Sequence, residues 1–179
     1  DNNLMMKVKN GDLDKLGLLY ERHKRNLFGF FYNLGNNPSV SEDLVQNVFV
    51  RILKYRRSYK GDGSFTAWMF SMARNINYDH HIKVSKQNIS RDIAPEDTEM
   101  GSEDSLNEAM DQNGNAIMLR QALSLLPNDK REILLLSKYR DLKLNEIAEI
   151  LGCTEGAAKV RTHRALKELR TIFLQLETA

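Results

Sequence analysis

Few residues of this chain have the types and spacing that covalent or metal chemistry requires. Its 179 residues include one cysteine, Cys153, and four histidines, of which His80 and His81 are adjacent. Adjacent residues on a helix point in different directions, so this pair is badly placed to share a metal ion. A nuclease or recombinase needs a nucleophile or a carboxylate cluster around a metal. We therefore expect no catalytic residue, no metal site and no cofactor, and we expect that the chain is not an enzyme.

The C-terminal third instead has residue types suited to DNA binding. Ala148, Gly152 and Thr154 are spaced as in a helix-turn-helix. In that motif a small residue permits close crossing, glycine makes the turn, and the second helix lies in the major groove. A helical hairpin within an ordinary bundle is the alternative interpretation.

The helix expected after Thr154 has two faces. Its inward positions step by four and three residues and are Ala158, Thr162, Ala165, Leu169 and Ile172. The opposite side is basic, and arginine can bond guanine while lysine neutralises phosphate. The residues expected on this DNA-reading side are Lys159, Val160, Arg161, His163, Arg164 and Lys167.

Aromatic and basic residues alternate in a second group, between residues 51 and 83. Aromatic planes stack on unpaired bases while cations follow the backbone, as in single-strand binders. Phe65 and Trp68 are equally consistent with a core role, the more frequent one for either residue alone. The group comprises Tyr55, Tyr59, Phe65, Trp68 and Tyr78 with Arg51, Lys54, Arg56, Arg57, Lys60, Arg74 and Lys83.

A third group consists of Asp43, Gln46, Asn47 and Val50, which stand beside an apolar stripe over residues 44–53. Such a mixed face can dock a helix of another protein. The solvated edge of a core helix is the equally plausible alternative.

The elements that position these groups are predicted to be helices, because apolar residues recur at three- and four-residue steps. Ser41, Ser64, Asn128 and Thr154 are the expected N-caps, whereas Lys143 leaves its helix without the usual side-chain cap. No strand pattern is present, so the predicted fold is all-α. The helices are expected over about 13–34, 42–53, 65–82, 117–126, 129–139 and 144–151, and from 155 onward.

The charge is distributed unevenly along the chain. Residues 1–90 carry a net +6, residues 91–118 a net −7 and residues 119–179 a net +3, although the total is only +2. Residues 90–115 are polar, acidic and without periodicity, which predicts a flexible linker between two small helical domains. The basic flanks suit phosphate backbones, although a solvated face is the alternative for either one alone.

The remaining composition indicates a cytoplasmic protein. One cysteine rules out an internal disulfide framework, and no tripartite export segment opens the sequence. The apolar runs are far too short to cross a bilayer, so we expect no membrane insertion.

Taken together, these segments resemble the sigma-70 family of bacterial transcription initiation factors, specifically its small extracytoplasmic-function (ECF) group. Any one motif is weakly specific, but their order around an acidic linker is highly specific. Three departures leave the promoter sequence open: Lys143 replaces a usual Ser or Thr, residues 156–158 replace a common Gly-Thr-Val, and Asn47 replaces an acid. The matching segments are Leu19–Arg22, Glu42–Gln46, Phe49–Arg51, Phe65–Met69, Arg74–Asp79, Leu125–Pro127, Glu146–Gly152 and Lys159–Leu166.

The resemblance implies a division of labour. Residues 1–89 would form a domain similar to sigma region 2, a bundle of three or four helices, and residues 116–179 one similar to region 4, joined by the acidic linker 90–115. Asp43, Gln46, Asn47 and Val50 would bind core RNA polymerase, and the basic face after Thr154 would read the −35 element as duplex. A flipped base of the single-stranded −10 element would be held by Arg56, Tyr59, Lys60, Asp62, Ser64, Phe65, Trp68, Arg74 and Asn75.

Two other functions remain as alternatives. A free-standing DNA-binding regulator shares the helix-turn-helix but needs no polymerase, and the aromatic and basic group argues against it. An enzyme with a helix-turn-helix tail would show metal-dependent DNA cleavage. The acidic linker between basic surfaces also predicts a compact free state that an anti-sigma factor would hold closed.

Overall fold

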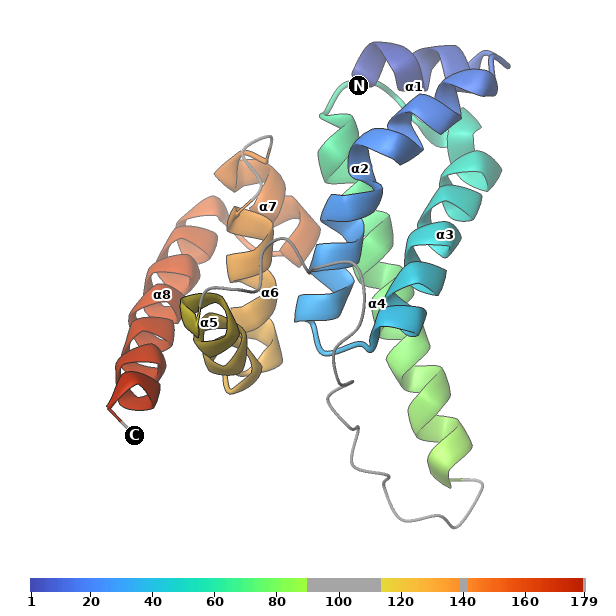
Figure 1. The fold of residues 1–179 in the computed structure, drawn as a ribbon. Coiled ribbons are helices and arrows are strands. Elements are labelled where there is room, and N and C mark those ends of the chain that lie inside the picture. Colours follow the sequence, from blue (N-terminus) through green and yellow to red (C-terminus); the bar gives the residue numbers. More distant parts are fainter. Residues whose placement is uncertain (90–113, 139–141, 179) are drawn as a thin grey trace. The chain divides into compact units, whose positions relative to one another are not determined.

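The computed structural model describes residues 1–89, 114–138 and 142–178, and all regular structure in these ranges is helical. The chain divides into two compact units (Figure 1). The N-terminal unit contains α1 (Asn2–Lys9), α2 (Asp14–Asn33), α3 (Pro38–Tyr55), the short 3₁₀ helix η1 (Arg56–Ser58) and α4 (Phe65–Ile89). The C-terminal unit contains α5 (Gly114–Ser124), α6 (Asn128–Ser137), α7 (Leu144–Leu151) and α8 (Glu155–Glu177). The prediction of an all-α fold is confirmed.

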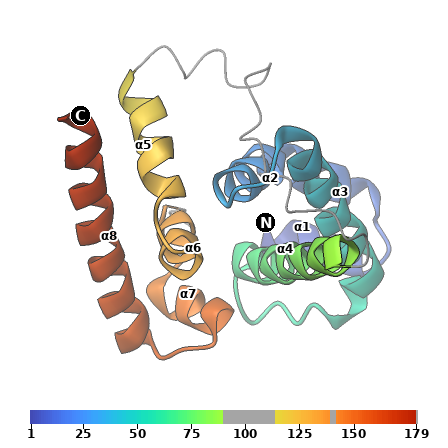
Figure 2. The same cartoon turned by 90° about the horizontal axis from the view of Figure 1, so that it is seen from below.

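The N-terminal unit is built on three helices, α2, α3 and α4, which lie side by side in both views (Figures 1 and 2). Their apolar stripes meet in an aromatic core. Phe30 of α2 contacts Phe70 of α4 edge to face, with ring centroids 5.2 Å apart, and Tyr20 contacts Phe49 of α3 at 5.0 Å. Burial of Phe30 and Phe70, both fully buried, contributes roughly 1.5–3 kcal/mol for each ring, so this core fixes the helices that present the surface residues.

The turn between α2 and α3 differs in one detail from the prediction. Gly35 adopts a positive φ of 103° after the end of α2, a conformation that glycine tolerates at a helix C-terminus. The N-cap of α3 is Asn37, whose side-chain oxygen accepts a hydrogen bond from the Val40 N–H at 2.8 Å. The expectation that Ser41 caps this helix is therefore wrong. Ser41 lies inside the first turns, buried, and donates its hydroxyl to the Asn37 carbonyl.

The C-terminal unit packs α5, α6 and α7 against α8. Its helix α6 begins at Asn128, with Pro127 as the N-cap residue, so the expectation that Asn128 caps the helix is also wrong. The end of α5 is held by Arg131 of α6, which donates to the Ser124 carbonyl at 2.6 Å and the Leu126 carbonyl at 3.0 Å. These bonds satisfy carbonyl groups that a helix end leaves without partners.

Most of the predicted linker, residues 90–113, lies outside the described residues. Gly114 and Asn115, which were assigned to it, begin α5 instead. No helix among the described residues is long and apolar enough to cross a membrane.

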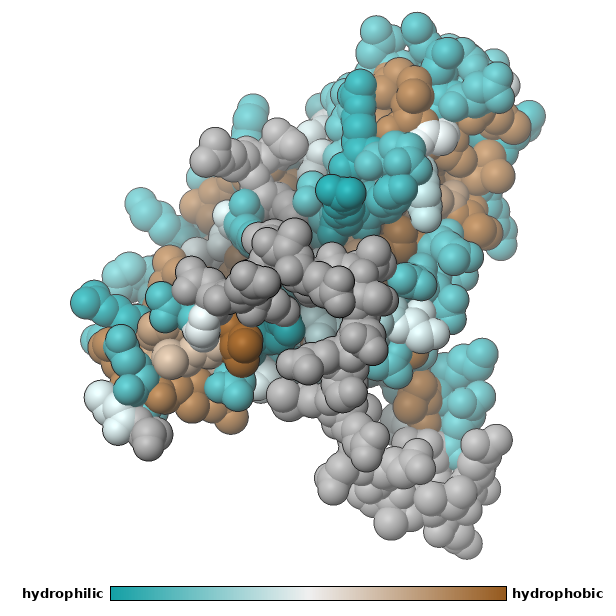
Figure 3. All heavy atoms as spheres, viewed as in Figure 1, coloured by the Kyte–Doolittle hydropathy of each residue, from teal (hydrophilic) through white to brown (hydrophobic). Residues whose placement is uncertain are grey.

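In the space-filling view, hydrophobic residues reach the surface of the C-terminal unit around α5 and the last turns of α8 (Figure 3). The exposed apolar residues of this unit include Ile117 and Leu119 of α5, Leu125 just after it and Leu174 of α8.

Candidate nucleic-acid interface

Helices α7 and α8 form the helix-turn-helix that the sequence predicted. Gly152 follows α7 with φ 64° and ψ 40°, a left-handed conformation that glycine adopts without strain. The Cys153 N–H donates to the Ala148 carbonyl at 2.9 Å, which closes the turn. Thr154 then caps α8, its hydroxyl accepting from the Ala157 N–H at 3.2 Å. Ala148 and Ala158 are both buried, so the two helices cross closely.

Helix α8 presents its basic residues to solvent. Ala158 and Ala165 are fully buried and Thr162 is half-buried, which confirms the predicted inward face. Val160, on the other side, is 48% exposed. The six residues predicted to read DNA are all exposed: Lys159, Val160, Arg161, His163, Arg164 and Lys167.

The electrostatics of this face favour an anionic partner. Glu155 lies in the first turn of α8, and Glu168, further along the helix, forms an ion pair with Lys130 of α6. In the described part of the chain, no ion pair involves Lys159, Arg164 or Lys167. Their charges therefore remain available to neutralise phosphates on a duplex.

The N-terminal unit brings part of the predicted −10 group together around the loop of residues 59–64. Lys60 and Asp62 are exposed in this loop, and Trp68 is half-buried on the first turn of α4. Ser64 caps α4 as predicted, accepting from the Ala67 N–H at 3.1 Å. Arg74 is half-buried and Asn75 is exposed further along the same helix.

Two aromatic residues of that group are core residues. Phe65 is 0% exposed and Tyr59 is 3% exposed, so neither ring is open to a stacking base. Of the two interpretations of Phe65, the core role is the one that the structure shows. Trp68 covers them, with its ring 5.0 Å from Tyr59 and 6.4 Å from Phe65. Trp68 is thus the ring of this cluster that reaches the surface.

Arg56 and Tyr59, two further residues of the predicted −10 group, lie at the end of α3 and at the start of the loop. Arg56 is half-buried and donates to the Leu53 carbonyl at 2.8 Å, at the end of α3. Burial raises the pKa of the Tyr59 hydroxyl above its usual value, and the nearby charge of Asp62 raises it further. Tyr59 therefore stays neutral beside the exposed loop.

The third predicted group forms a continuous exposed face on α3. Asp43, Gln46, Asn47 and Val50 are all exposed, and Val50 is exposed by 63%. The apolar stripe on the other side of α3 is buried from Leu44 to Ile52, as predicted. An exposed valine beside polar residues is suited to contact a helix of a partner protein.

No group of three or more His, Cys, Asp or Glu residues in the described part of the chain is arranged to hold a metal ion. His80 and His81 contact each other, with ring centroids 5.7 Å apart.

Comparison with known proteins assigns the chain to a family. Residues 19–86 match the family model "Sigma-70 region 2", and residues 116–169 match "Sigma-70, region 4". The two matches have the order that the sequence motifs predicted and cover both units. The chain belongs to the sigma-70 family.

Relatives along nearly the whole chain place this sigma factor in the ECF group. It is 28% identical to the RNA polymerase sigma factor CarQ of Myxococcus xanthus, over 97% of each chain. It is also 28% identical to the ECF RNA polymerase sigma factor SigX of Bacillus subtilis, over 86% of this chain and 80% of SigX. This sigma factor is therefore a transcription initiation factor that directs RNA polymerase to promoters. Sigma factors as a class are non-enzymatic transcription factors.

A solved structure shares the fold. The sigma factor RpoE of Bartonella quintana, in complex with the anti-sigma factor NepR, superposes with a TM-score of 0.72 at 23% identity. The match covers 90% of this sigma factor and 96% of RpoE.

No helix and no functional residue was predicted among the first twelve residues, yet α1 contacts the loop 59–64. Asn2 and Lys9 donate hydrogen bonds to carbonyl groups at the two ends of that loop. The available signal was weak, because Met5 and Val8 are the only fully buried residues of this short helix. A contact between segments some fifty residues apart leaves no periodic pattern in the sequence.

Proposed function

We propose that this sigma factor reads promoters with two separate surfaces and binds core RNA polymerase with a third. Residues 1–89 bind the polymerase and the −10 element, residues 116–179 bind the −35 element, and residues 90–115 link the two domains. The observation that carries this proposal is the coincidence on α8 of the family's reading positions with an exposed basic face.

The −35 element is read as duplex by α8. Its exposed face combines arginines, which bond guanine in the major groove, with lysines suited to phosphates. Arg164 and His163 lie on the outward side near the middle of the helix and contact base edges. Lys159 and Lys167 neutralise the flanking phosphates.

The −10 element is read as a single strand by the loop 59–64 and Trp68. A base that leaves the duplex loses stacking worth a few kcal/mol, which stacking on an aromatic ring offsets. Trp68 supplies that ring, and the exposed Lys60 attracts the backbone. Tyr59 and Phe65 support Trp68 from below instead of meeting the base themselves.

The exposed face of α3 binds a helical element of core polymerase. Val50 supplies an apolar contact at its C-terminal end, and Asp43, Gln46 and Asn47 supply polar contacts beside it. All chemistry of nucleotide addition then belongs to the polymerase, and this sigma factor is not itself an enzyme.

The free protein is held inactive in the cytoplasm by an anti-sigma factor. RpoE, which shares the fold, was solved with such a partner. Exposed apolar side chains on α5 and α8, such as Ile117 and Leu174, support a further protein partner.

Gel filtration with purified core RNA polymerase tests the part of the proposal on which the rest depends. The unaltered chain should elute with the polymerase as a stable complex. Val50→Asp should dissociate it while leaving the helical content unchanged, and the exposed Ser39→Asp, at the start of the same helix, should not. If the unaltered chain fails to bind cognate polymerase but still binds duplex DNA, a free-standing DNA-binding regulator is the better description.

A further inference from the structure

The loop of residues 59–64 has little structure of its own. Residues 60–63 are exposed, and two of them are glycines, with Gly61 at φ 81°. Glycine populates many backbone conformations, so such a loop loses much conformational entropy when it is ordered. Whatever fixes this loop in one conformation also fixes the shape that a base would meet.

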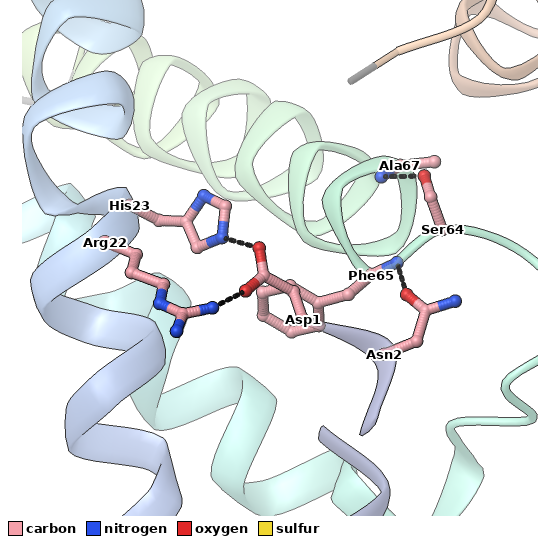
Figure 4. Close-up of polar contacts among 7 residues, drawn as sticks. All are labelled: Asp1, Asn2, Arg22, His23, Ser64, Phe65 and Ala67. Carbon is pink, nitrogen blue, oxygen red and sulfur yellow. Dashed lines mark hydrogen bonds and ion pairs between the residues drawn. The ribbon is translucent and has the colours of Figure 1, made fainter. Parts of the chain in front are cut away.

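Asn2 of α1 binds the C-terminal end of the loop with both polar atoms of its side chain. Its Nδ2 donates to the Gly63 carbonyl at 2.9 Å. Its Oδ1 accepts from the Phe65 N–H at 2.7 Å, a contact drawn in Figure 4. Phe65 is the first residue of α4, and its N–H would otherwise lack an intrahelical partner. A residue from another helix thus completes the cap that Ser64 begins.

The same face of α1 contacts the rest of the loop. Lys9 donates from Nζ to the Tyr59 carbonyl at 2.5 Å, at the N-terminal end of the loop. Met6 lies beside Gly61, where an added Cβ would stand 3.3 Å from the Met6 sulfur. Positions 2, 6 and 9 are four and three residues apart and therefore share one side of a helix. One short helix holds the loop at both ends and in the middle.

Helix α1 is itself anchored to the unit. Met5 and Val8 are fully buried. Asp1 connects the start of α1 to α2, with one carboxylate oxygen 2.7 Å from Arg22 and the other 2.8 Å from the His23 ring (Figure 4). Through α1, the loop is held in place by the core of the unit as well as by its own flanking residues.

We propose that α1 is a positioning element for −10 recognition, and that Asn2 and Lys9 set the selectivity of the loop without touching DNA. This inference rests on the proposed function, because it assumes that the loop meets the −10 base. It extends that function to residues that belong to neither the −35 set nor the −10 set of predicted DNA-contacting residues.

The test compares variants of the full chain in run-off transcription with core RNA polymerase. The promoter is first selected from a library with the unaltered chain, and single-base changes are then made in its −10 and −35 elements. Asn2→Ala removes both hydrogen bonds. Asn2→Asp keeps an acceptor for the Phe65 N–H, loses the donor to the Gly63 carbonyl and adds a negative charge. Asn3→Ala, at the exposed neighbouring position, is the matched control.

We expect Asn2→Ala to lower the ratio of transcription between the best and the altered −10 element about fivefold, since each lost hydrogen bond has a modest effect. Asn2→Asp should recover part of that ratio, Asn3→Ala should match the unaltered chain, and the corresponding −35 ratio should stay unchanged in all of them. An unchanged −10 ratio for Asn2→Ala would overturn the inference, as would an equal loss at both elements, which indicates a general loss of folded protein.

Lys9→Met provides a second, independent variant at the other end of the loop. It should also lower the −10 ratio alone, and an unchanged ratio would overturn the inference even if Asn2→Ala does not fold. Absence of specific transcripts with the unaltered chain is a different result. It would contradict the proposed function itself, before any variant is compared.

Discussion

The indole of Trp68 packs against the ring of Tyr59, with ring centroids 5.0 Å apart and planes tilted by 56°. Tyr59 is buried and also contacts Phe65 edge to face at 6.4 Å. The ring that reaches solvent is therefore supported by two rings that do not. A base that stacks on Trp68 meets a side chain whose freedom has already been lost in folding, and such preorganisation favours binding.

Replacement of Trp68 by alanine should weaken binding of the −10 single strand. Loss of one stacking ring costs about 1–3 kcal/mol per base. The measurement is fluorescence anisotropy of a labelled non-template strand with the chain and core polymerase. Phe28→Ala, which removes a half-buried ring from α2 of the same unit, should leave the affinity unchanged. Equal affinities for Trp68→Ala and the unaltered chain would remove Trp68 from the reading surface.

Replacement of Tyr59 by phenylalanine should preserve the cluster and alter its response to alkali. The buried Tyr59 hydroxyl makes no hydrogen bond within the described structure, so its removal should raise the free energy of unfolding by up to about 1 kcal/mol. Burial and Asp62 raise the folded pKa, so the unfolded chain ionises first. Tyr59 therefore lowers stability as the pH rises from the unfolded value of about 10.

Chemical denaturation at pH 8 and at pH 10.5 or so measures this effect. The stability of the unaltered chain should fall more steeply with pH than that of Tyr59→Phe. Parallel curves for the two proteins would show that the Tyr59 hydroxyl ionises as freely in the folded chain as in the unfolded one.

Alanine variants of Arg164 and Lys167 should change duplex DNA binding in different ways. Arg164→Ala should cost about 1–3 kcal/mol on the best −35 duplex and relax the preference at one base pair. Lys167→Ala should weaken binding to all duplexes equally and lower the number of counterions released on binding by about one. Titrations at several salt concentrations distinguish the two, with the exposed Gln175→Ala at the end of α8 as the control. If Arg164→Ala lowers the affinity for all duplexes equally, Arg164 contacts a phosphate and not a base.

Replacement of Lys143 by threonine should stabilise the C-terminal unit. Lys143 is the N-cap residue of α7 and supplies no side-chain acceptor, although its own N–H donates to the Glu146 carboxylate at 2.8 Å. A threonine would add the missing half of a capping box, worth about 1 kcal/mol. Lys143→Ala removes the same charge without an acceptor and is the control in denaturation of the full chain. Equal stability of the two variants would contradict the capping explanation.

The sequence predicted α7, α8 and the core stripe of α3 because each depends on contacts between residues three or four apart. The outward face of α8 followed from the same periodicity, since its inward positions are small or apolar. The fold class and the family were likewise readable from local motifs in order. These features need no knowledge of distant contacts.

The differences between prediction and structure have two physical origins. Ser41 and Asn128 have good capping side chains, but a proline near each allowed the helix to begin elsewhere, at Pro38 and at Asn128 itself. The burial of Tyr59 and Phe65 depends on α2 and Trp68, which periodicity within one segment does not reveal. The contacts of α1 with the loop 59–64 were missed for the same reason.

Run-off transcription from a promoter library with purified core RNA polymerase of the same organism tests the central claim most directly. Specific transcripts should appear only when the chain is added, and the selected promoters should share one element near −35 and another near −10. Trp68→Ala should then relax selection at the −10 element alone, and Arg164→Ala at the −35 element alone. A chain that binds the polymerase yet yields no promoter-specific transcripts, or one whose variants relax both elements together, would contradict promoter reading by two separate surfaces.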